Sequence, residues 1–567
     1  ATMRVRPIRP QDAQALQAFH VAQSEQSTYY RFFAPLRRLP ERDLVRLVHV
    51  DHVDRVALVV VAGEAIVAVG RYDRVEPDTA EVAFNVSDTL QGRGLGSVLL
   101  EHLAAAARER GITTFVADVL PGNARMIRVF TDAGYEVRQR YEDGVISLEF
   151  RIDPTEASLE VLAGREQRTE AASMRSLLAP EGVLVLAGSA EAELADDLLR
   201  HLRVPAHVRV LAVGSALAQV GEHRHAQDLA TAGELEEEFQ LAVVAGTPSE
   251  VVSWLPDLAH LGVRGVVVLS GGFEHGEVSQ RDLLIAVRAC GVRLVGPRSF
   301  GVVTDAGYER LSAALWPTSP PLGGTALFCQ SSAAAASLMT LVDRYALGVA
   351  TFVSAGHRAD VSGNDLLQYV ADDKDVLAVG MYLESLGNPR KFARVARRVS
   401  ARVPVVAVVG AAYGVAGPDG NALGRSVVEE AMLAAGVLVA PTMRAMVEAT
   451  QLLVHAPLPR GSRVAVLSSS LSLADLAAAQ VQHLDPHPSV VAVTNGGADG
   501  QAMTEAAHRL AQDPDWDVLL VVYSPQLRHR DPQVMAALAA LASTGRTVLA
   551  VVHGLLGVTA ELTGATG

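Results

Sequence analysis

The stretch Ala80–Leu100, AEVAFNVSDTLQGRGLGSVLL, contains the residues whose types and spacing most clearly indicate chemistry. A strand-like apolar run, Ala80–Val86, leads into the glycine-rich loop Gln91–Gly96, and a helical pattern begins at once. Glycines let a backbone approach a ligand closely, and the free N–H groups of a helix N-terminus favour an anion. Arg93 adds a positive charge. The loop is therefore predicted to bind a diphosphate.

A dinucleotide-binding fingerprint is the competing interpretation of this loop. That fingerprint needs a parallel strand–helix–strand unit with an acidic residue after the next strand, and it lies at the start of its domain. Here the loop follows a later, central strand of its domain, so we favour another kind of phosphate-binding site.

Five short Val-rich runs within residues 1–152 predict the strands that must position the loop. They lie at 55–61, 65–72, 80–86, 114–119 and 145–152, with helical patterns at 10–23, 41–48, 94–110 and 123–133. The polar segment 153–172 is interpreted as a linker or a linking helix.

From residue 173 onward the sequence alternates strand and helix patterns. Pro/Gly-rich breaks at 316–324 and 455–461 divide this part into three sets. The strands are nearly continuous Val, Leu and Ala runs, which are typical of strands buried on both faces of a parallel sheet. The sequence therefore predicts an α/β protein with three doubly wound parallel-sheet domains after residue 172. The expected strands are 182–186, 208–213, 241–245, 265–269 and 292–295, then 325–329, 349–353, 376–381, 403–409 and 437–439, then 463–468, 489–493, 518–522 and 547–552.

The composition excludes several classes of protein. A net charge of −14 over 567 residues argues against bulk nucleic-acid binding. The two cysteines are too few for a disulfide scaffold or a cysteine-based metal site. No run of about 18 apolar residues occurs and the start does not resemble a signal peptide, so we expect a cytoplasmic protein. The cluster of His49, Asp51, His52 and Asp54 is interpreted as a polar turn, and no metal is expected.

The loop and a second motif together resemble the GNAT acyltransferases. The loop matches that superfamily's Gln/Arg-x-x-Gly-x-Gly/Ala acetyl-CoA motif, and Val119–Val137, VLPGNARMIRVFTDAGYEV, matches its Asn-containing helix and the aromatic strand that follows. The segment Ser27–Leu39 and the run AEVAF further resemble the bacterial protein lysine acetyltransferases that carry an acyl-CoA synthetase-like module. The resemblance covers essentially the whole chain, and it implies a GNAT fold over 1–152 with acetyl-CoA as co-substrate.

In this chemistry an amine attacks a thioester directly, so a base must take a proton and an N–H group must stabilise the thioester oxygen. In the resembling lysine acetyltransferases the Glu of AEVAF is the base, which implies Glu81 here. A structural carboxylate paired with Arg71 or Arg74 is the alternative. The splayed strand of GNAT folds supplies the N–H donor, which implies the backbone of Asn85–Ser87 and above all Val86.

The resemblance also assigns residues around the cofactor. Asn123 is expected to hydrogen-bond the pantetheine, and capping of a helix is an alternative that can hold at the same time. Many GNAT enzymes have a tyrosine seven residues later as the acid for the thiolate. Here Phe130 stands in that place, Tyr135 is expected in the core, and the acid stays unassigned. Tyr29–Phe32 are expected to precede a helix and either to line the acceptor cleft or to pack in the core. The predicted cofactor-binding residues are Asn85, Val86, Gln91, Gly92, Arg93, Gly94, Leu95, Gly96, Ser97 and Asn123.

Residues 173–567 resemble the NDP-forming acyl-CoA synthetases, which are related to succinyl-CoA synthetase. The longest matching pieces are Phe352–Asp373 and Tyr382–Val399. They imply a CoA-binding Rossmann-like domain followed by two flavodoxin-like succinyl-CoA-ligase-type domains. The expected division is a GNAT domain at 1–152, a linker at 153–172, the CoA-binding domain at 173–315, and the two ligase-like domains at 320–456 and 460–567.

Several chemical parts of that second family are altered in this chain. The first strand–helix turn, 187–193, reads AGSAEAE, and its two carboxylates would repel a phosphate. Asp419 stands where the family has its phosphohistidine, so Glu384 lacks its histidine partner, and His357 replaces a plain Asn. The chain ends where an ATP-grasp domain would begin. We therefore expect a catalytically inactive module with a regulatory or structural role.

The expected function is acetyl-CoA-dependent N-acetyl transfer to a protein lysine. The resemblance implies an acyl-CoA synthetase as the target. Transfer to a small-molecule amine and a non-enzymatic CoA or acyl-CoA sensor are the alternatives. We expect a protein substrate as partner, neither nucleic acid nor membrane, and leave open a homo-oligomer.

Overall fold

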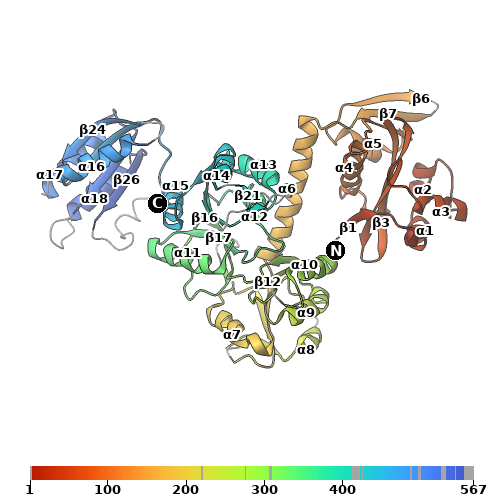
Figure 1. The fold of residues 1–567 in the computed structure, drawn as a ribbon, viewed down its shortest axis with the longest axis horizontal. Helices are drawn as coiled ribbons and strands as arrows, with labels where there is room; N and C mark the ends of the chain where they lie inside the picture. The colour runs from red at the N-terminus through yellow and green to blue at the C-terminus, as the bar shows by residue number, and fades with distance from the viewer. Residues whose placement is uncertain are drawn as a thin grey trace. The chain divides into compact units, whose positions relative to one another are not determined.

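The computed structural model of the protein describes residues 3–553 except 143, 219–220, 236, 275, 306–308, 411–414, 417–421, 424, 485–487, 496–499, 525–531 and 543. The chain divides into two compact units, Ala1–Thr169 and Glu170–Gly567. Figure 1 shows the elements of both units.

A seven-stranded sheet forms the centre of the first unit, in the order β1-β2-β3-β4-β5-β7-β6. Every neighbouring pair is antiparallel except β4 and β5, which run parallel. The five strands predicted from the Val-rich runs are present, β6 is the strand that the GNAT resemblance implies after the Asn-containing helix, and β1 was not predicted. The strands are β1 (Arg4–Pro7), β2 (Arg55–Ala62), β3 (Ala65–Glu76), β4 (Thr79–Val86), β5 (Thr114–Val119), β6 (Val137–Glu142) and β7 (Val145–Arg151).

Helices cover both faces of this sheet. One face packs under α4 and α5, where Val82 and Phe84 meet Leu99 and Phe130 in one core. The other face packs under α1 and α3 through residues such as Val59. Because successive strand residues alternate in direction, Glu81 lies on the face opposite Val82. The helices are α1 (Ala13–Val21), α2 (Glu25–Phe32), α3 (Glu41–Val48), α4 (Leu95–Arg108) and α5 (Ala124–Thr131), with short 3₁₀ turns at η1 (Pro10–Asp12) and η2 (Asp88–Leu90).

The segment expected to link the domains forms a helix, α6 (Glu156–Leu178). Its first half is held to α4 by the ion pair of Arg165 with Glu101. Its last turns bury Met174 and Leu177 in the core of the second unit.

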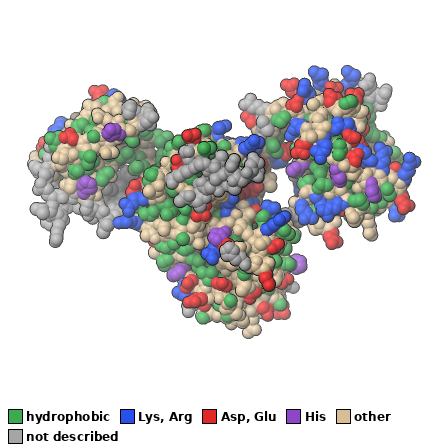
Figure 2. Space-filling view, in the orientation of Figure 1, with side chains coloured by type: hydrophobic (Ala, Val, Ile, Leu, Met, Phe, Trp, Pro, Cys, Tyr) green, Lys and Arg blue, Asp and Glu red, His purple; other side chains and the backbone are tan. Residues whose placement is uncertain are grey.

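The basic and acidic side chains of the first unit are interspersed on the face seen in Figure 2, rather than separated into patches of one sign.

A six-stranded parallel sheet, ordered β10-β9-β8-β11-β12-β13, opens the second unit. Its five predicted strands are present, and β10 is an additional edge strand. The strands are β8 (Gly182–Ala187), β9 (Arg209–Val213), β10 (Arg224–Ala226), β11 (Leu241–Ala245), β12 (Gly265–Val268) and β13 (Arg293–Val295), with η3 (Ser189–Glu191) and helices α7 (Ala192–His201), α8 (Leu229–Gly233), α9 (Pro248–His260) and α10 (Gln280–Cys290).

The next sheet is mixed, in the order β15-β14-β17-β16-β18-β19-β22. The prediction of a wholly parallel sheet is wrong here, because β14 runs antiparallel to both β15 and β17. Residues 301–305 and 310–314, which the sequence analysis assigns to the preceding domain, thus form two strands of this sheet. The elements are β14 (Gly301–Asp305), β15 (Arg310–Ala314), β16 (Leu322–Cys329), α11 (Ser332–Tyr345), β17 (Val349–Ser354), α12 (Gly363–Val370), β18 (Ala378–Leu383), α13 (Pro389–Ser400), β19 (Val405–Val409), β20 (Val415–Ala416), β21 (Ala422–Leu423), α14 (Arg425–Ala434), β22 (Val437–Val439) and α15 (Met443–His455).

The last sheet has four parallel strands in the order β24-β23-β25-β26. All four predicted strands are present. The elements are β23 (Arg463–Ser468), α16 (Leu471–Gln482), β24 (Ser489–Asn495), α17 (Gly500–Gln512), β25 (Val518–Tyr523), α18 (Pro532–Ala542) and β26 (Thr547–Val552). In the part of the chain that the structure describes, no helix is long and apolar enough to cross a membrane.

Candidate active site

The parallel strands β4 and β5 separate part of the way along their length. Their pairing ends at Glu81 and Val116, although β4 continues to Val86 and β5 to Val119. A V-shaped opening therefore lies between their carboxyl ends. An extended ligand can enter this opening and meet backbone groups of β4 that have no strand partner on that side.

The backbone of Val86 supplies a donor to this opening. The N–H of Ser87 donates to the carbonyl of Val67 on β3, with N and O 2.9 Å apart. Because successive N–H groups of a strand point in opposite directions, the N–H of Val86 points away from β3. It is thus directed toward the opening, the side where the sequence analysis expects an oxyanion donor.

The glycine-rich loop lies between η2 and α4. Gly92 and Gly94 have φ angles of +79° and +81°, which favour glycine, and Gly94 caps α4. The side chain of Arg93 is exposed. The first N–H groups of α4 have no partner within the helix, so they can bind an anion beside Arg93. Gly96 is needed for another reason, since a Cβ there would lie 3.3 Å from Val129 of α5.

The side chain of Gln91 points back to the framework of the opening. Its Nε2 donates to the carbonyl of Val86 at 3.3 Å and to Asp88 Oδ1 at 3.0 Å. Its Oε1 accepts from Arg125 of α5 at 3.1 Å. Sequence reasoning missed Asp88 and Arg125. For Asp88, the only signal in the sequence was its position three residues before Gln91.

Asn123 begins α5 as its N-cap. Its side-chain oxygen accepts from the N–H of Met126 at 3.2 Å. This is the structural alternative that the sequence analysis named, and the role in pantetheine binding stays a prediction. Asn123 follows β5 at the carboxyl end of the opening.

Phe130 belongs to an aromatic core. It is 1% exposed, and its ring centroid lies 5.8 Å from that of Phe84 and 5.5 Å from that of Phe150. Tyr135 stacks on Phe150 at 5.6 Å. Tyr135 is thus packed against the core as expected, and Phe130 has no hydroxyl to donate.

The candidate base Glu81 is exposed on β4. Arg74, one of its two expected structural partners, instead contacts Asp54, with Nε and Oδ1 2.6 Å apart. The other, Arg71, donates to the carbonyl of Leu47 at 3.1 Å. Among the described residues Glu81 makes no ion pair, so its carboxylate is available to an acceptor.

Arginines raise the positive potential around Glu81. Burial lowers the pKa of Arg31 on α2, although the charges of Glu81 and Asp73 act in the opposite direction. Burial lowers the pKa of Arg71 to about 10, and the charge of Arg31 contributes to that shift. The positive charges of these arginines favour a neutral amine over an ammonium group in an acceptor.

The aromatic segment Tyr29–Phe32 lies within α2 rather than before a helix. Ser24 starts this helix by accepting from Ser27 N–H, a cap that the sequence analysis did not consider. Tyr29 is exposed, whereas Phe32 packs edge-on against His20 with centroids 5.3 Å apart. Phe32 therefore packs against the core, and the role of the segment in an acceptor cleft stays a prediction.

The polar turn near residue 51 is closed by one carboxylate. Asp51 Oδ1 accepts from the N–H groups of Val53, Asp54 and Arg55 at 2.8–2.9 Å. The hydrogen bond from Arg55, and then that from Val53, lower the pKa of Asp51. One oxygen of this carboxylate therefore binds three successive backbone N–H groups and closes the turn.

In the second unit, acidic side chains lie at the first strand–helix turn. A Cβ on Gly188 would lie 2.6 Å from the carboxylate of Glu250, which therefore lies against the turn. Glu191 ends the 3₁₀ turn that follows β8. Two carboxylates at this position create a negative electrostatic potential where a CoA diphosphate would lie.

The residues near the altered ligase motifs contact one another through polar interactions. Gln330 is buried and accepts from the N–H groups of Glu384 and Ser385 at 2.7 and 2.8 Å. His357 Nδ1 lies 2.6 Å from Glu274, a residue of the loop after β12. Asp419, the residue in the place of the phosphohistidine, lies outside the described residues.

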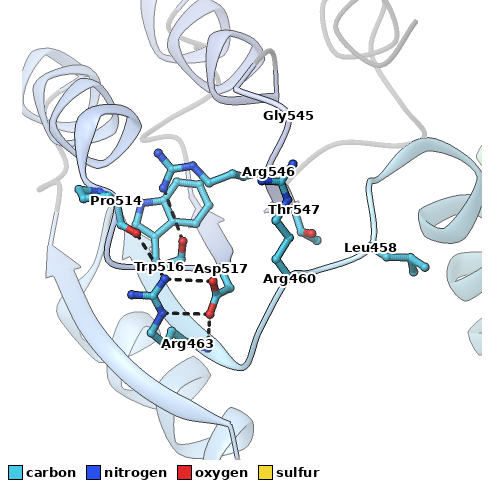
Figure 3. Close-up of a pocket in the computed structure, with 9 residues that line it drawn as sticks. All are labelled: Leu458, Arg460, Arg463, Pro514, Trp516, Asp517, Gly545, Arg546 and Thr547. Carbon is cyan, nitrogen blue, oxygen red and sulfur yellow. Dashed lines mark hydrogen bonds and ion pairs between the residues drawn. The ribbon is translucent and has the colours of Figure 1, made fainter.

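A cavity of about 320 Å³ lies at the amino-terminal edge of the last sheet (Figure 3). Two of its arginines already have partners. Arg463 contacts Asp517 at 3.0 Å, and Arg546 lies over the ring of Trp516 and donates to the carbonyl of Asp513. Parallel α/β sheets bind ligands at the opposite, carboxyl edge, so this cavity is not a candidate active site.

Three family models match the chain. The acetyltransferase (GNAT) family matches residues 19–135, a CoA-binding domain matches 183–305, and a succinyl-CoA ligase-like flavodoxin domain matches 322–453. The glycine-rich loop and the opening between β4 and β5 lie inside the first of these matches.

Individual relatives match different parts. The acetyltransferase Pat of Mycolicibacterium smegmatis is 33% identical over 157 residues, which are 27% of this chain and 46% of Pat. The crystal structure of the GNAT domain of S. lividans PAT is 51% identical and covers 27% of this chain and 91% of that domain, with a TM-score of 0.26.

The alpha subunit of ADP-forming acetate–CoA ligase II of Pyrococcus furiosus is 28% identical over 320 residues, 51% of this chain and 69% of the subunit. The chain also matches four further ADP-forming acetate–CoA ligase proteins, and each match covers between 25% and 53% of the length of that relative.

Proposed function

Because this chain carries a GNAT-family acetyltransferase domain ahead of a CoA-binding domain and a succinyl-CoA ligase-like flavodoxin domain, we propose that it transfers the acetyl group of acetyl-CoA to the ε-amino group of a protein lysine. The GNAT domain is an N-acetyltransferase domain and acetyl-CoA is its co-substrate. The observation that carries the proposal is the opening between β4 and β5, with the exposed Glu81 at the point where the strands separate.

In the proposed mechanism each element of this opening has one task. The N–H groups of the glycine-rich loop and α4, with Arg93, hold the diphosphate. Glu81 takes a proton from the lysine ammonium, directly or through a water molecule, and the free amine attacks the thioester carbon. The N–H of Val86 stabilises the negative charge that develops on the thioester oxygen.

The C–S bond then breaks and the CoA thiolate leaves. Phe130 cannot protonate it, because it is a buried hydrocarbon ring. A thiolate is a much better leaving group than an amide nitrogen or an alkoxide, so we infer that the reaction needs no side-chain acid here. This inference separates the chain from GNAT enzymes with a tyrosine at the corresponding position.

The acceptor in this proposal is a lysine of a protein, and an acyl-CoA synthetase is the proposed target. The similarity to Pat supports an acetyltransferase of this kind. The half-buried Arg31 beside Glu81 adds a physical argument, because a positive potential helps a lysine to lose its proton.

We propose that the synthetase-like module makes no acyl-CoA and has a regulatory or structural role. The carboxylate of Glu250 against Gly188 supports this proposal, because it opposes CoA binding at the usual turn. The ion pair of His357 with Glu274 supports it too, since that imidazole is already bound to another loop.

The proposed function is tested by incubating the full chain with labelled acetyl-CoA and a purified acyl-CoA synthetase. Mass spectrometry of the synthetase locates the acetylated residue. We expect acetylation of one lysine by the wild type and little by Glu81→Gln, with Glu64→Gln in the exposed β2–β3 turn as the matched control. Acetylation of small amines alone would favour the alternative acceptor class.

A further inference from the structure

Asp88, the first residue of η2, accepts hydrogen bonds from two segments that lie close together in the fold. Its Oδ2 accepts from the N–H of Ser24, the N-cap of α2, at 2.7 Å. Its Oδ1 accepts from the hydroxyl of Ser27 on α2 and from Gln91 Nε2 of the glycine-rich loop, the latter at 3.0 Å. One carboxylate thus joins the start of α2 to the loop, alongside the direct hydrogen bond that Gln91 Nε2 donates to Ser27 Oγ at 3.3 Å.

The same helix reaches the other side of the opening. Tyr30 donates its hydroxyl to the carbonyl of Gly122, which follows β5, at 3.1 Å. A Cβ on Gly122 would lie 3.0 Å from that hydroxyl, so the contact is close. Therefore α2 connects the carboxyl end of β4 with that of β5, and it also carries Arg31 beside Glu81.

We propose that Asp88 is a positioning residue that couples binding of acetyl-CoA at the glycine-rich loop to the order of α2 on the acceptor side. This inference rests on the proposed function, because it takes the loop as the site of the CoA diphosphate. When the bound diphosphate orders the loop, it also orders the side chain of Gln91. The hydrogen bonds of Asp88 then order Ser24 and Ser27 at the start of α2.

The carboxylate suits this task because it accepts hydrogen bonds and donates none when ionised. Burial alone would raise the pKa of Asp88, but the bonds from Ser27 and Ser24 outweigh it and lower the pKa. Asp88 therefore stays ionised at neutral pH and can hold all of its donors together. An amide in its place would direct an NH₂ group at donors.

The coupling implies an order of events. Acetyl-CoA binds first and orders α2, and the acceptor then meets a helix already in place. Coupling free energies between sites usually correspond to about 5- to 150-fold changes in affinity. A role of Asp88 in general stability alone would change α2 to the same extent with and without cofactor.

Amide hydrogen exchange of the full chain, with CoA as the probe and no acceptor, tests the proposal. In the wild type we expect CoA to slow exchange at least about fivefold in the loop and in α2. In Asp88→Asn we expect CoA to slow amide hydrogen exchange in the loop but not in α2. Glu64→Gln, another exposed acid-to-amide change, is expected to behave as the wild type.

Ser27→Ala serves as the second variant if Asp88→Asn fails to fold, because it removes one donor to Asp88 and the acceptor of Gln91 Nε2 but keeps the carboxylate. It is expected to weaken the effect of CoA on α2 while the loop stays protected. An α2 that CoA leaves unchanged in the wild type, or protects equally in the variants, would overturn the coupling. Absence of protection in the wild-type loop would instead contradict the proposed function.

Discussion

Asp73 lies directly opposite Glu81 in the antiparallel pairing of β3 and β4. Arg55, on β2, holds the Asp73 carboxylate with Nε and Oδ1 3.2 Å apart. The candidate base therefore has a second carboxylate as its neighbour, and that neighbour already has a cationic partner. Cross-strand neighbours have their Cβ atoms roughly 4.5–5.5 Å apart, so these charges influence one another.

Replacement of the candidate base tests the chemical step. Glu81→Gln is expected to lower kcat/KM by about 10²–10⁴-fold, because general-base catalysis contributes that much. The dissociation constant of acetyl-CoA, measured by calorimetry, is expected to stay unchanged, since Glu81 does not belong to the loop. A variant that keeps full activity would exclude Glu81 as the base.

The charge of Arg31 is expected to set the pH dependence of the reaction. The Arg31→Gln variant loses a cation whose charge interacts with that of Glu81. The ammonium form of the acceptor amine then becomes more favourable, so the acidic limb of the kcat/KM profile should move to higher pH. Arg38→Gln, an exposed change in the same segment, should leave the limb in place. An acidic limb that stays in place in Arg31→Gln would contradict this role.

Substitution of Gly94 separates backbone strain from cofactor binding. Gly94→Ala places a side chain at a φ of +81°, where a non-glycine residue costs roughly 1–2 kcal/mol. Gly63, at a φ of +62° in the β2–β3 turn, is the matched control, and a Cβ meets nothing within 4 Å at either position. Both variants should lose similar stability in thermal unfolding, but only Gly94→Ala should raise the KM for acetyl-CoA. An equal KM in both would place the diphosphate elsewhere.

A network around Arg293 should control the stability of the second unit. Arg293 contacts Glu170 and Asp360 at 2.8 Å and Asp365 at 3.2 Å. Arg293→Met leaves these carboxylates without their common partner, which should cost about 3–5 kcal/mol at neutral pH. Calorimetric unfolding of the full chain measures the effect, and Arg288→Met, at an exposed position of α10, provides the control.

The pH dependence of this loss follows from the pKa of Asp365. Burial would raise that pKa, but the charge of Arg293 and the hydrogen bonds from Ser362 and Glu170 together outweigh burial and lower the pKa below the ordinary value of 3.8. A lowered carboxyl pKa contributes stability above its ordinary value, and the contribution is lost as the pH falls through the folded value. The difference between the wild type and Arg293→Met should therefore shrink in acid. A difference that does not change with pH would contradict the charge argument.

Local patterns predicted much of the fold. The positions of β4 and the glycine-rich loop followed from the composition and spacing of Ala80–Leu100, because glycines and alternating apolar residues act over a few residues. The GNAT domain and the two synthetase-like domain types are confirmed by the family matches. The roles of Glu81 and of the loop residues stay predictions.

The sequence by itself determined most of the strands and the position of the glycine-rich loop, and it predicted a diphosphate site there, since these properties depend on neighbouring residues. Only the tertiary structure decided that β4 and β5 separate beyond Glu81, that Asp88 reaches Ser24 across 64 residues, and that β14 pairs with β17. Such contacts depend on strand register and chain topology. Periodicity along the sequence carries no information about which distant segment a strand or a carboxylate will meet.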